Sequence, residues 1–251
     1  MSEPATLFAF DNTWEVIGLV GVIVILRVAV PRIPPLTQWR AGIIEFIDSA
    51  LIAALLVFCL LRPFVIQAFY IPSGSMEPTL LQNDRILVSK FIYFFREPVA
   101  GEIAVFNAPP QASETNKDFI KRVVGVEGDR LSVTPDMPGV RKGGLQRNGQ
   151  LLIESYLNEP PHYRWPRNTG EFVKLPDGEI SEVKADEEFV VPPGHVVMMG
   201  DNRNNSNDSH RWERIDQESG RRVSEPYVPR ANLLGKAEII FWPPQRIRIL
   251  H

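Results

Sequence analysis

The chain has 251 residues and a formal net charge of −3, from 27 Lys and Arg against 30 Asp and Glu. This length suits one large domain or two small ones, and the small negative charge gives no basis for nucleic acid as a partner. Cys59 is the only cysteine, which excludes a disulfide framework and a cysteine metal site.

Two apolar runs occupy the N-terminal quarter of the chain. The first covers about residues 14–31 of an N-terminal segment 1–42, and the second covers residues 43–66. A membrane-spanning helix needs about 20 mostly apolar residues, and both runs reach this length with their charged residues at the interfaces. No Lys or Arg precedes Arg27, so the first run is not a cleaved signal peptide. We expect two transmembrane helices; a buried two-helix hairpin in a soluble protein is the alternative.

Basic residues between the two runs set the expected orientation. Arg32 and Arg40 lie in this short loop, with Arg27 beside it, and short loops with an excess of Lys and Arg are cytoplasmic. The N-terminus and everything after the second run then lie outside. Residues 67–251 are therefore expected to form an extracytoplasmic domain, and membrane lipid is an expected partner of the chain.

Beyond the second run the expected fold is mostly β, an antiparallel β-sheet domain. Short segments rich in branched and aromatic residues predict strands at residues 64–71, 85–91, 102–106, 119–126, 145–153, 188–191, 196–199 and 237–242. The dipeptide Asn148-Gly149 is the strongest short hairpin signal. A more polar, Pro-rich stretch at about residues 130–192 is expected to form an inserted smaller β subdomain.

The stretch from Phe69 to Leu80 predicts a strand that ends in a tight, exposed turn, because an apolar run breaks at Pro72 and continues as Ser-Gly-Ser. Gly74 relieves steric limits there, so the backbone can present a neighbouring side chain at an unusual angle. This geometry suits a nucleophilic serine. An ordinary turn, with hydroxyls bonded to their own backbone, is the alternative.

One lysine lies among apolar residues on the strand predicted at 119–126. Alternation places Lys121 on the same face as Phe119 and Val123, where burial disfavours its charged form and lowers its pKa. A neutral amine can take a proton from a serine. A surface lysine with an apolar stem is the alternative.

A dense polar loop, Gly200 to His210, follows the strand predicted at 196–199. Such residues bond their own backbone and make a loop rigid. A calcium loop is the alternative, but the required alternation of acidic positions, central Gly and terminal Glu is not met. No metal site and no organic cofactor are expected.

These stretches occur in an order that resembles the membrane-bound type I signal peptidases of bacteria, the Ser-Lys leader peptidases. The matching segments are residues 71–80 (Ile-Pro-Ser-Gly-Ser-Met-Glu-Pro-Thr-Leu), 84–91, 119–125 (Phe-Ile-Lys-Arg-Val-Val-Gly), 200–209 and 235–243. The resemblance implies a β-rich catalytic domain with an inserted β subdomain. It covers most of the chain after residue 64.

The resemblance also implies roles for individual residues. Ser75 is the expected nucleophile and Lys121 the general base. Ser73 and the Ser75 backbone N–H form the expected oxyanion hole, and Ser206 is expected to hydrogen-bond Lys121. Further supporting residues are Arg122 and Asp201, expected to pair with each other, and Asp208. The expected apolar lining for small substrate side chains consists of Phe69, Ile71, Met76, Leu80, Phe119 and Ile120.

The implied function is the removal of N-terminal signal peptides from exported precursors through an acyl-enzyme, at the bacterial inner (plasma) membrane. Signal-peptide-bearing precursor proteins are the expected partners. Secretion machinery is a further possible partner, and a monomer is expected. The alternative is an inactive membrane-anchored β module that binds or scaffolds other proteins. A Ser-His-Asp hydrolase using Ser75 with His195 or His210 is a further rival, because triads are recognised by geometry rather than by order.

Two features depart from the family pattern. His210 stands where the family usually has Arg, so a fixed charge is replaced by a side chain that titrates near neutrality; Arg211 is a possible substitute. The chain also carries an additional stretch, residues 215–227, before Val228-Pro229. Both put the support of the polar loop in question.

Overall fold

The computed structural model of the chain describes residues 13–30, 39–56, 66–115, 117–137, 139, 142–166, 171–183 and 187–251. The chain divides into two compact units, Met1–Ile66 and Gln67–His251. The loop that contains Arg32, and residues 57–65 of the second apolar run, lie outside the described residues.

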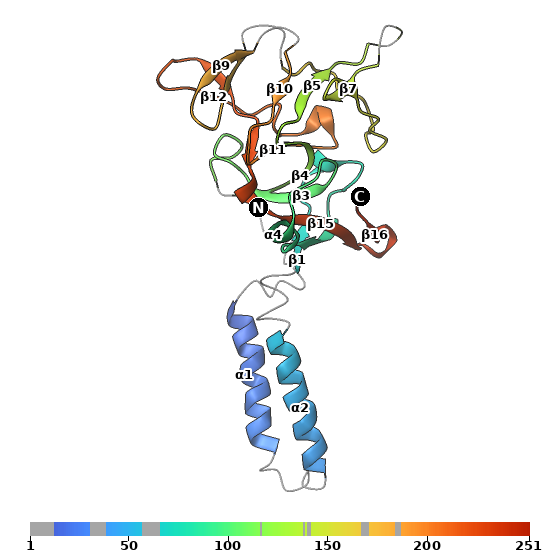
Figure 1. Cartoon of the computed structure of the whole chain (residues 1–251). Helices are drawn as coiled ribbons and strands as arrows, with labels where there is room; N and C mark the ends of the chain where they lie inside the picture. The colour runs from blue at the N-terminus through green and yellow to red at the C-terminus, as the bar shows by residue number, and fades with distance from the viewer. Residues whose placement is uncertain are drawn as a thin grey trace. The chain divides into compact units, whose positions relative to one another are not determined.

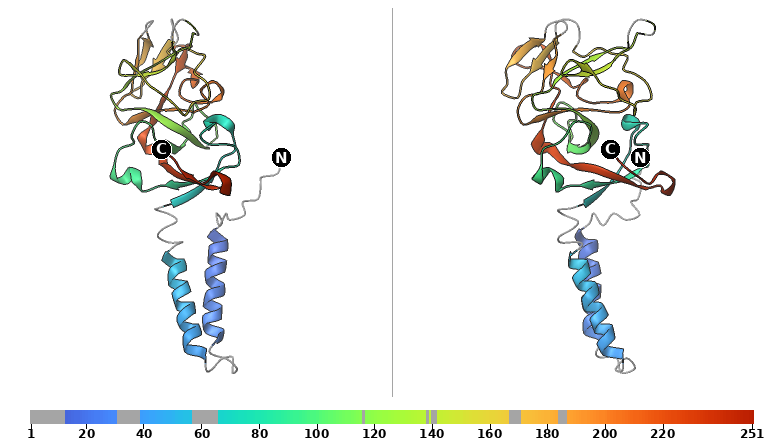
Figure 2. Two further views of the ribbon diagram at one scale, coloured as in Figure 1. Left: turned by 90° about the vertical axis from the view of Figure 1, so that its right-hand side faces the viewer. Right: turned by 45° about the vertical axis from the view of Figure 1, so that its right-hand side comes forward.

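The first unit contains two helices, α1 (Thr13–Ala29) and α2 (Arg40–Leu55), which contact each other and are seen side by side in the left view of Figure 2. Arg27 Nε of α1 donates to Asp48 Oδ1 of α2 at 2.5 Å, so the charge in the first run has a partner on the second. Within the described parts of these helices, neither is long and apolar enough to cross a membrane.

The second unit is built on an eight-stranded sheet (Figure 1). Its strands are, in spatial order, β1 (Ile66–Tyr70), β2 (Arg85–Ser89), β15 (Leu233–Trp242), β3 (Ile103–Asn107), β4 (Asp118–Val126), β11 (His195–Met199) and β14 (Tyr227–Pro229), with β16 (Arg248–Ile249) paired to β15. The pairings from β2 to β14 are antiparallel. The mostly β, antiparallel fold is therefore confirmed.

Two smaller sheets lie beyond β4 in the sequence. One contains β10 (Phe189–Val190), β5 (Arg130–Thr134), β6 (Gly144–Arg147) and β7 (Gln150–Leu151). The other contains β12 (Glu213–Ile215), β13 (Arg222–Ser224), β8 (Glu171–Lys174) and β9 (Ile180–Val183). Asn148 and Gly149 have φ of 54° and 76° and join β6 to β7, which confirms the predicted hairpin.

The additional stretch before Val228 forms part of the third sheet. β12 and β13 pair with each other, and β13 pairs in parallel with β8. Residues from both sides of the polar loop thus build one sheet, so the smaller β region extends beyond residue 192 in space.

Short helical segments connect the strands. They are α4 (Ile92–Phe95) and the 3₁₀ turns η4 (Gly74–Met76), η5 (Arg203–Asn205), η6 (Arg230–Asn232) and η7 (Pro244–Arg246).

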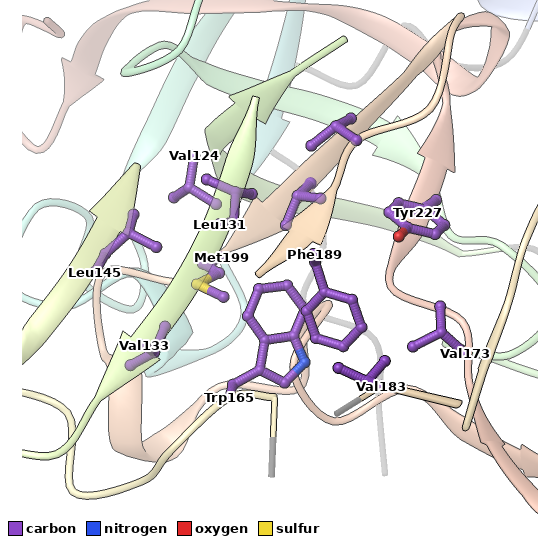
Figure 3. Close-up of a cluster of buried hydrophobic side chains, with 12 residues drawn as sticks. Val124, Leu131, Val133, Leu145, Trp165, Val173, Val183, Phe189, Met199 and Tyr227 are labelled. Atoms are coloured by element: carbon purple, nitrogen blue, oxygen red, sulfur yellow. The ribbon is translucent and has the colours of Figure 1, made fainter. Parts of the chain in front are cut away.

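We call the predicted inserted subdomain, about residues 130–192, the insert. It shares one hydrophobic core with the main sheet, shown in Figure 3. Val124 and Met199 of the main sheet pack in the same cluster as Leu131 of β5 and Phe189 of β10. Phe189 contacts the Trp165 ring at a centroid distance of 4.3 Å, with the two ring planes tilted by 38°. The smaller sheets are therefore fixed to the main sheet by packing.

Candidate active site

The turn that carries Ser75 follows β1 directly. Ile71 and Met76, on either side of Ser75, are 2% and 0% exposed and lie in a core cluster of the main sheet. These two buried side chains fix both ends of the turn, and Ser75 lies half-buried in η4 between them. The predicted strand ending in a tight turn is confirmed. Gly74 is not in the left-handed region; a Cβ there would instead be 2.8 Å from the Glu77 carboxylate.

Lys121 reaches Ser75 from β4. Its Nζ lies 2.6 Å from Ser75 Oγ, and the side chain is only 5% exposed. The ammonium position also lies 5.5 Å from the centre of the Phe119 ring. Burial lowers the pKa of Lys121 to about 8, although the negative charges of Asp208 and Asp201 oppose this change. The lowered pKa increases the fraction of molecules in which the Lys121 amine is neutral near pH 7.

Ser73 lies on the exposed side of the same turn. Its Oγ is 3.5 Å from Ser75 Oγ, at the outer limit of a hydrogen bond. Because Ser73 is exposed while Ser75 is half-buried, the Ser73 hydroxyl is available to a group that approaches Ser75 from solvent.

Arg122, the residue after Lys121 on β4, forms a buried ion pair with Asp201. Arg122 Nε and Nη2 donate to the two carboxylate oxygens at 2.8 and 2.7 Å, and the side chains are 3% and 0% exposed. Arg122 Nη1 also donates to the carbonyls of Gly101 and His251. Burial opposes the charge of Arg122, but the hydrogen bond and charge of Asp201 raise its pKa overall. The pair therefore anchors β4 one residue beyond Lys121.

The polar loop touches the turn that carries Ser75 directly. Asn202 N–H donates to Ser75 O at 3.1 Å, and Asn202 Nδ2 donates to Gly74 O at 3.0 Å. Gly200 lies so close that a Cβ on it would be 2.4 Å from Ser75 O. Only glycine allows this approach, so the loop and the turn are in contact through their backbones.

His210 is the partner of Asp208. Its Nδ1 lies 2.6 Å from Asp208 Oδ1, and the other carboxylate oxygen accepts from Gly200 N–H at 2.8 Å. Burial would raise the pKa of Asp208, but its hydrogen bonds to His210 and to the Gly200 N–H lower it overall. Arg211 donates to His210 Nε2 at 3.3 Å. Arg211 thus supports His210 and does not take its place at Asp208.

Ser206 is placed differently from the prediction. Its Oγ is buried and makes no hydrogen bond of normal geometry within the described residues, so the expected bond to Lys121 is not formed. The hydroxyl instead lies against Gly200, where a Cβ would be 2.3 Å from it, and close enough to Asp208 to help lower the pKa of that carboxyl. Ser206 therefore packs within the polar loop against Gly200, and the partner of Lys121 is Ser75.

The expected apolar lining divides into two groups. Ile71, Met76 and Leu80 are at most 2% exposed and belong to the core, so they lie beneath the turn and cannot contact a substrate there. Phe69, Phe119 and Ile120 are only partly buried and pack at the edges of the core clusters. These three are the members of the predicted lining that a substrate side chain can reach.

Several residues of the site were not predicted from the sequence. Asn202 donates to the Gly74 carbonyl of the turn that carries Ser75, and Thr79 Oγ1 donates to Asp201 Oδ2 at 2.5 Å. Arg203 forms a buried ion pair with Glu154, which lies 49 positions earlier. The run of amide and carboxylate side chains in the loop signalled a hydrogen-bonded network, but not which partners it joins.

No histidine of the described residues bonds Ser75, which argues against a Ser-His-Asp triad. Ser75 Oγ has Lys121 and Ser73 as partners. His210 pairs with Asp208, and His195 Nδ1 lies 2.7 Å from the Pro193 carbonyl. The part of the chain that the structure describes also contains no group of three or more His, Cys, Asp or Glu side chains suited to a metal.

Comparisons with known proteins point the same way as the geometry. A family model described as signal peptidase, peptidase S26, matches residues 43–242. A probable signal peptidase I-2 of Synechocystis is 35% identical, over 86% of this chain and 79% of the relative. A signal peptidase I of Leptolyngbya laminosa is 37% identical over 74% of both chains. A signal peptidase I of Pseudomonas aeruginosa is 36% identical, over 77% of this chain and 71% of the relative.

Proposed function

We propose a Ser-Lys mechanism for this chain, which belongs to the type I signal peptidases of peptidase family S26. In this mechanism Ser75 is the nucleophile and Lys121 the general base for cleavage of exported precursors. The single observation that carries the proposal is the 2.6 Å separation of Lys121 Nζ and Ser75 Oγ, with Lys121 buried. A buried lysine with a lowered pKa beside a serine is a recognised way to activate that serine.

The first chemical step is acylation. The neutral Lys121 amine accepts the Ser75 hydroxyl proton while Oγ forms a bond to the carbonyl carbon of the scissile peptide. The carbonyl oxygen takes up the negative charge, and the Ser73 hydroxyl and Ser75 N–H donate to it. When the tetrahedral intermediate collapses, the peptide C–N bond breaks and the Lys121 ammonium returns a proton to the departing amine. The signal peptide then remains as an ester on Ser75.

The second step is hydrolysis of this ester. Lys121, neutral again, takes a proton from a water molecule that attacks the ester carbon, and the returning proton restores the Ser75 hydroxyl. The Arg122–Asp201 pair contributes by holding β4 in place, because a reacting group that shifts by about 1 Å can lose about a hundredfold in rate.

Substrate choice is proposed to depend on a shallow apolar surface. Phe69, Phe119 and Ile120 are partly buried bulky side chains, and they leave room for small residues at the cut. A larger side chain is rejected sterically, whereas loss of a methylene costs only about 1–3 kcal/mol. The expected substrates are precursors with a basic end, an apolar core and small residues before the cleavage site.

Membrane anchoring is the second part of the proposal. The apolar sequence runs at about 14–31 and 43–66 are proposed to hold the enzyme in a bacterial plasma membrane, with residues 67–251 on the extracytoplasmic side. Holding enzyme and precursor on one surface raises their effective concentration. A topology reporter fused after residue 66 tests this arrangement, and reporter activity only on the cytoplasmic side would overturn it.

Cleavage of a purified precursor by the detergent-solubilised full chain tests the catalytic proposal. The wild type should release the signal peptide and should be labelled by a serine-reactive acylating probe, and Ser75→Ala should lose both. Ser181→Ala, which removes the same hydroxyl from an exposed position of β9, is the matched control. Precursor binding without cleavage or labelling in the wild type would instead support a non-enzymatic β module.

A further inference from the structure

A segment of the insert lies along the polar loop of the active site. We name residues 154–163 the strap; it has no strand or helix in the structure. The strap follows β7 in the sequence and ends near Trp165, whose ring packs in the shared core. It is therefore held at both ends by the insert.

A buried ion pair joins the strap to the polar loop. Arg203 Nη1 and Nη2 donate to the two Glu154 oxygens at 2.8 and 2.5 Å, and the side chains are 0% and 5% exposed. Arg203 Nε also donates to Gly200 O at 3.1 Å, and Tyr156 OH donates to Glu154 Oε1 at 2.5 Å. A two-point bond of this kind fixes orientation as well as distance. The strap thus reaches the glycine that lies against Ser75 O.

Three hydrogen bonds and two ring contacts follow along the strap. Asn204 Nδ2 donates to Glu159 Oε1 at 2.8 Å and to the Pro160 carbonyl at 3.1 Å, and Asn204 Oδ1 accepts from His162 N–H at 2.9 Å. Tyr163 stacks on His210 with ring centres 4.0 Å apart and planes 7° from parallel. Tyr156 lies under the Arg122 guanidinium at 3.9 Å. The strap therefore contacts the loop at both ends and also the ion pair behind Lys121.

The loop passes these contacts on to the nucleophile. Asn202 lies between Arg203 and Asp201, and its N–H and Nδ2 hold the carbonyls of Ser75 and Gly74. Moving the loop by a fraction of an ångström would therefore move the Ser75 backbone relative to Lys121. The chain from Glu154 through Arg203 to Asn202 and Ser75 is a continuous set of hydrogen bonds and peptide links.

We propose that the strap positions the catalytic Ser75–Lys121 pair through Arg203 and Asn202, so that Glu154 is a positioning residue for cleavage. This inference rests on the proposed Ser-Lys function. It assigns to the insert a role in the rate of reaction, since the strap touches the loop and contributes no reactive group.

The central experiment is Glu154→Gln in the detergent-solubilised full chain, with cleavage kinetics and probe labelling. The substitution keeps the side-chain shape and removes the charge that fixes Arg203. We expect kcat and the labelling rate to fall by about ten- to hundredfold, with KM changed less than threefold or so because the strap does not line the proposed substrate surface. Amide exchange of residues 200–206 should become faster.

Asn204→Ala covers the case in which Glu154→Gln does not fold. It removes three hydrogen bonds to the strap without leaving a buried charge, and it should lower kcat in the same direction by a smaller factor. Asp216→Asn is the matched control, because it removes the carboxylate of the partly buried Lys174–Asp216 ion pair, which joins the insert to the additional stretch 215–227. Among the described residues, no hydrogen bond joins this pair to the polar loop. The Asp216→Asn substitution should alter unfolding but leave kcat unchanged.

Two results would overturn the inference: wild-type kcat in folded Glu154→Gln or Asn204→Ala, or an equal loss of kcat in Asp216→Asn. Absence of Ser75-dependent cleavage in the wild type would instead overturn the proposed function. In that case the exchange of residues 200–206 still decides the strap contact, because unchanged exchange in Glu154→Gln would show that the strap does not hold the loop.

Discussion

Substitution of Lys121 by Met separates a catalytic lysine from a structural one. Methionine keeps an unbranched stem of similar length and removes the titrating amine. Because Lys121 Nζ is the hydrogen-bond partner of Ser75 Oγ, we expect Lys121→Met to abolish precursor cleavage while the fold remains intact. Lys121→Arg should also be inactive, since a guanidinium is not deprotonated in proteins.

The stability of the Met variant follows from the pKa of the lysine. Burial lowers the pKa of Lys121 from 10.5 to about 8, and each pKa unit corresponds to about 1.4 kcal/mol, so the charged form costs about 3 kcal/mol in the folded state. Between these two pKa values the unfolded state binds more protons, so this lysine makes stability rise with pH across that window. The full cost applies below pH 8 and is absent above about pH 10.5.

Urea unfolding of the wild type and of Lys121→Met from pH 7 to pH 10 measures the free-energy cost of the buried ammonium. At pH 7 the Met variant should be at least as stable as the wild type. The difference in unfolding free energy, Met variant minus wild type, should decrease by about 2–3 kcal/mol between pH 7 and pH 10, while packing differences cancel because they do not titrate. A difference that stays constant with pH would refute the buried-amine argument, and substantial turnover in either variant would exclude Lys121 as the base.

Three further outcomes are expected. Ser73→Ala should keep labelling of Ser75 detectable but lower kcat by about 10²–10³ through loss of one oxyanion donor; complete loss, as in Ser75→Ala, would contradict the separate roles. Gly200→Ala should lower kcat by about a hundredfold or more, since its Cβ would lie 2.4 Å from Ser75 O, and wild-type turnover would show that the loop moves freely. A precursor with Phe just before the cut should not be cleaved in a processing assay, and cleavage at the normal rate would show that the proposed surface is not the specificity site.

The main sheet was predictable because its strands are long enough to show a pattern. β4 extends over nine residues rich in branched side chains, and the runs at 85–91, 102–106 and 196–199 match β2, β3 and β11. The Asn148-Gly149 turn was predictable because both residues tolerate positive φ, which a two-residue hairpin requires.

The strands of the smaller sheets were harder to predict. β12 and β13 have three residues each, which is too short for a hydrophobic period to be visible. They are strands because β13 pairs with β8, a partner about 50 residues earlier in the chain. Non-local pairing of this kind leaves no local signal in the sequence.

The sequence predicted which segments are strands and turns better than it predicted which side chains are buried. Met76 and Leu80 were expected to line a substrate surface, but both are 0% exposed. An apolar side chain next to a reactive serine can point to solvent or to the core, and the path of the turn decides between them. Ser206 shows the same limit for polar residues, because its hydroxyl faces Gly200 and not Lys121.

By itself, the sequence determined which candidate catalytic groups the chain carries. A serine in a Pro-Gly turn, a lysine among apolar neighbours and a rigid polar loop are local features, and each depends on residue type and near spacing. The tertiary structure decided what these features do together. Lys121 lies 46 positions from Ser75, and Glu154 lies 49 positions from Arg203. Packing of the strands in the folded domain buries Lys121 and thereby lowers its pKa. The same packing brings the strap into contact with the polar loop, because burial and charge pairing depend on neighbours in space.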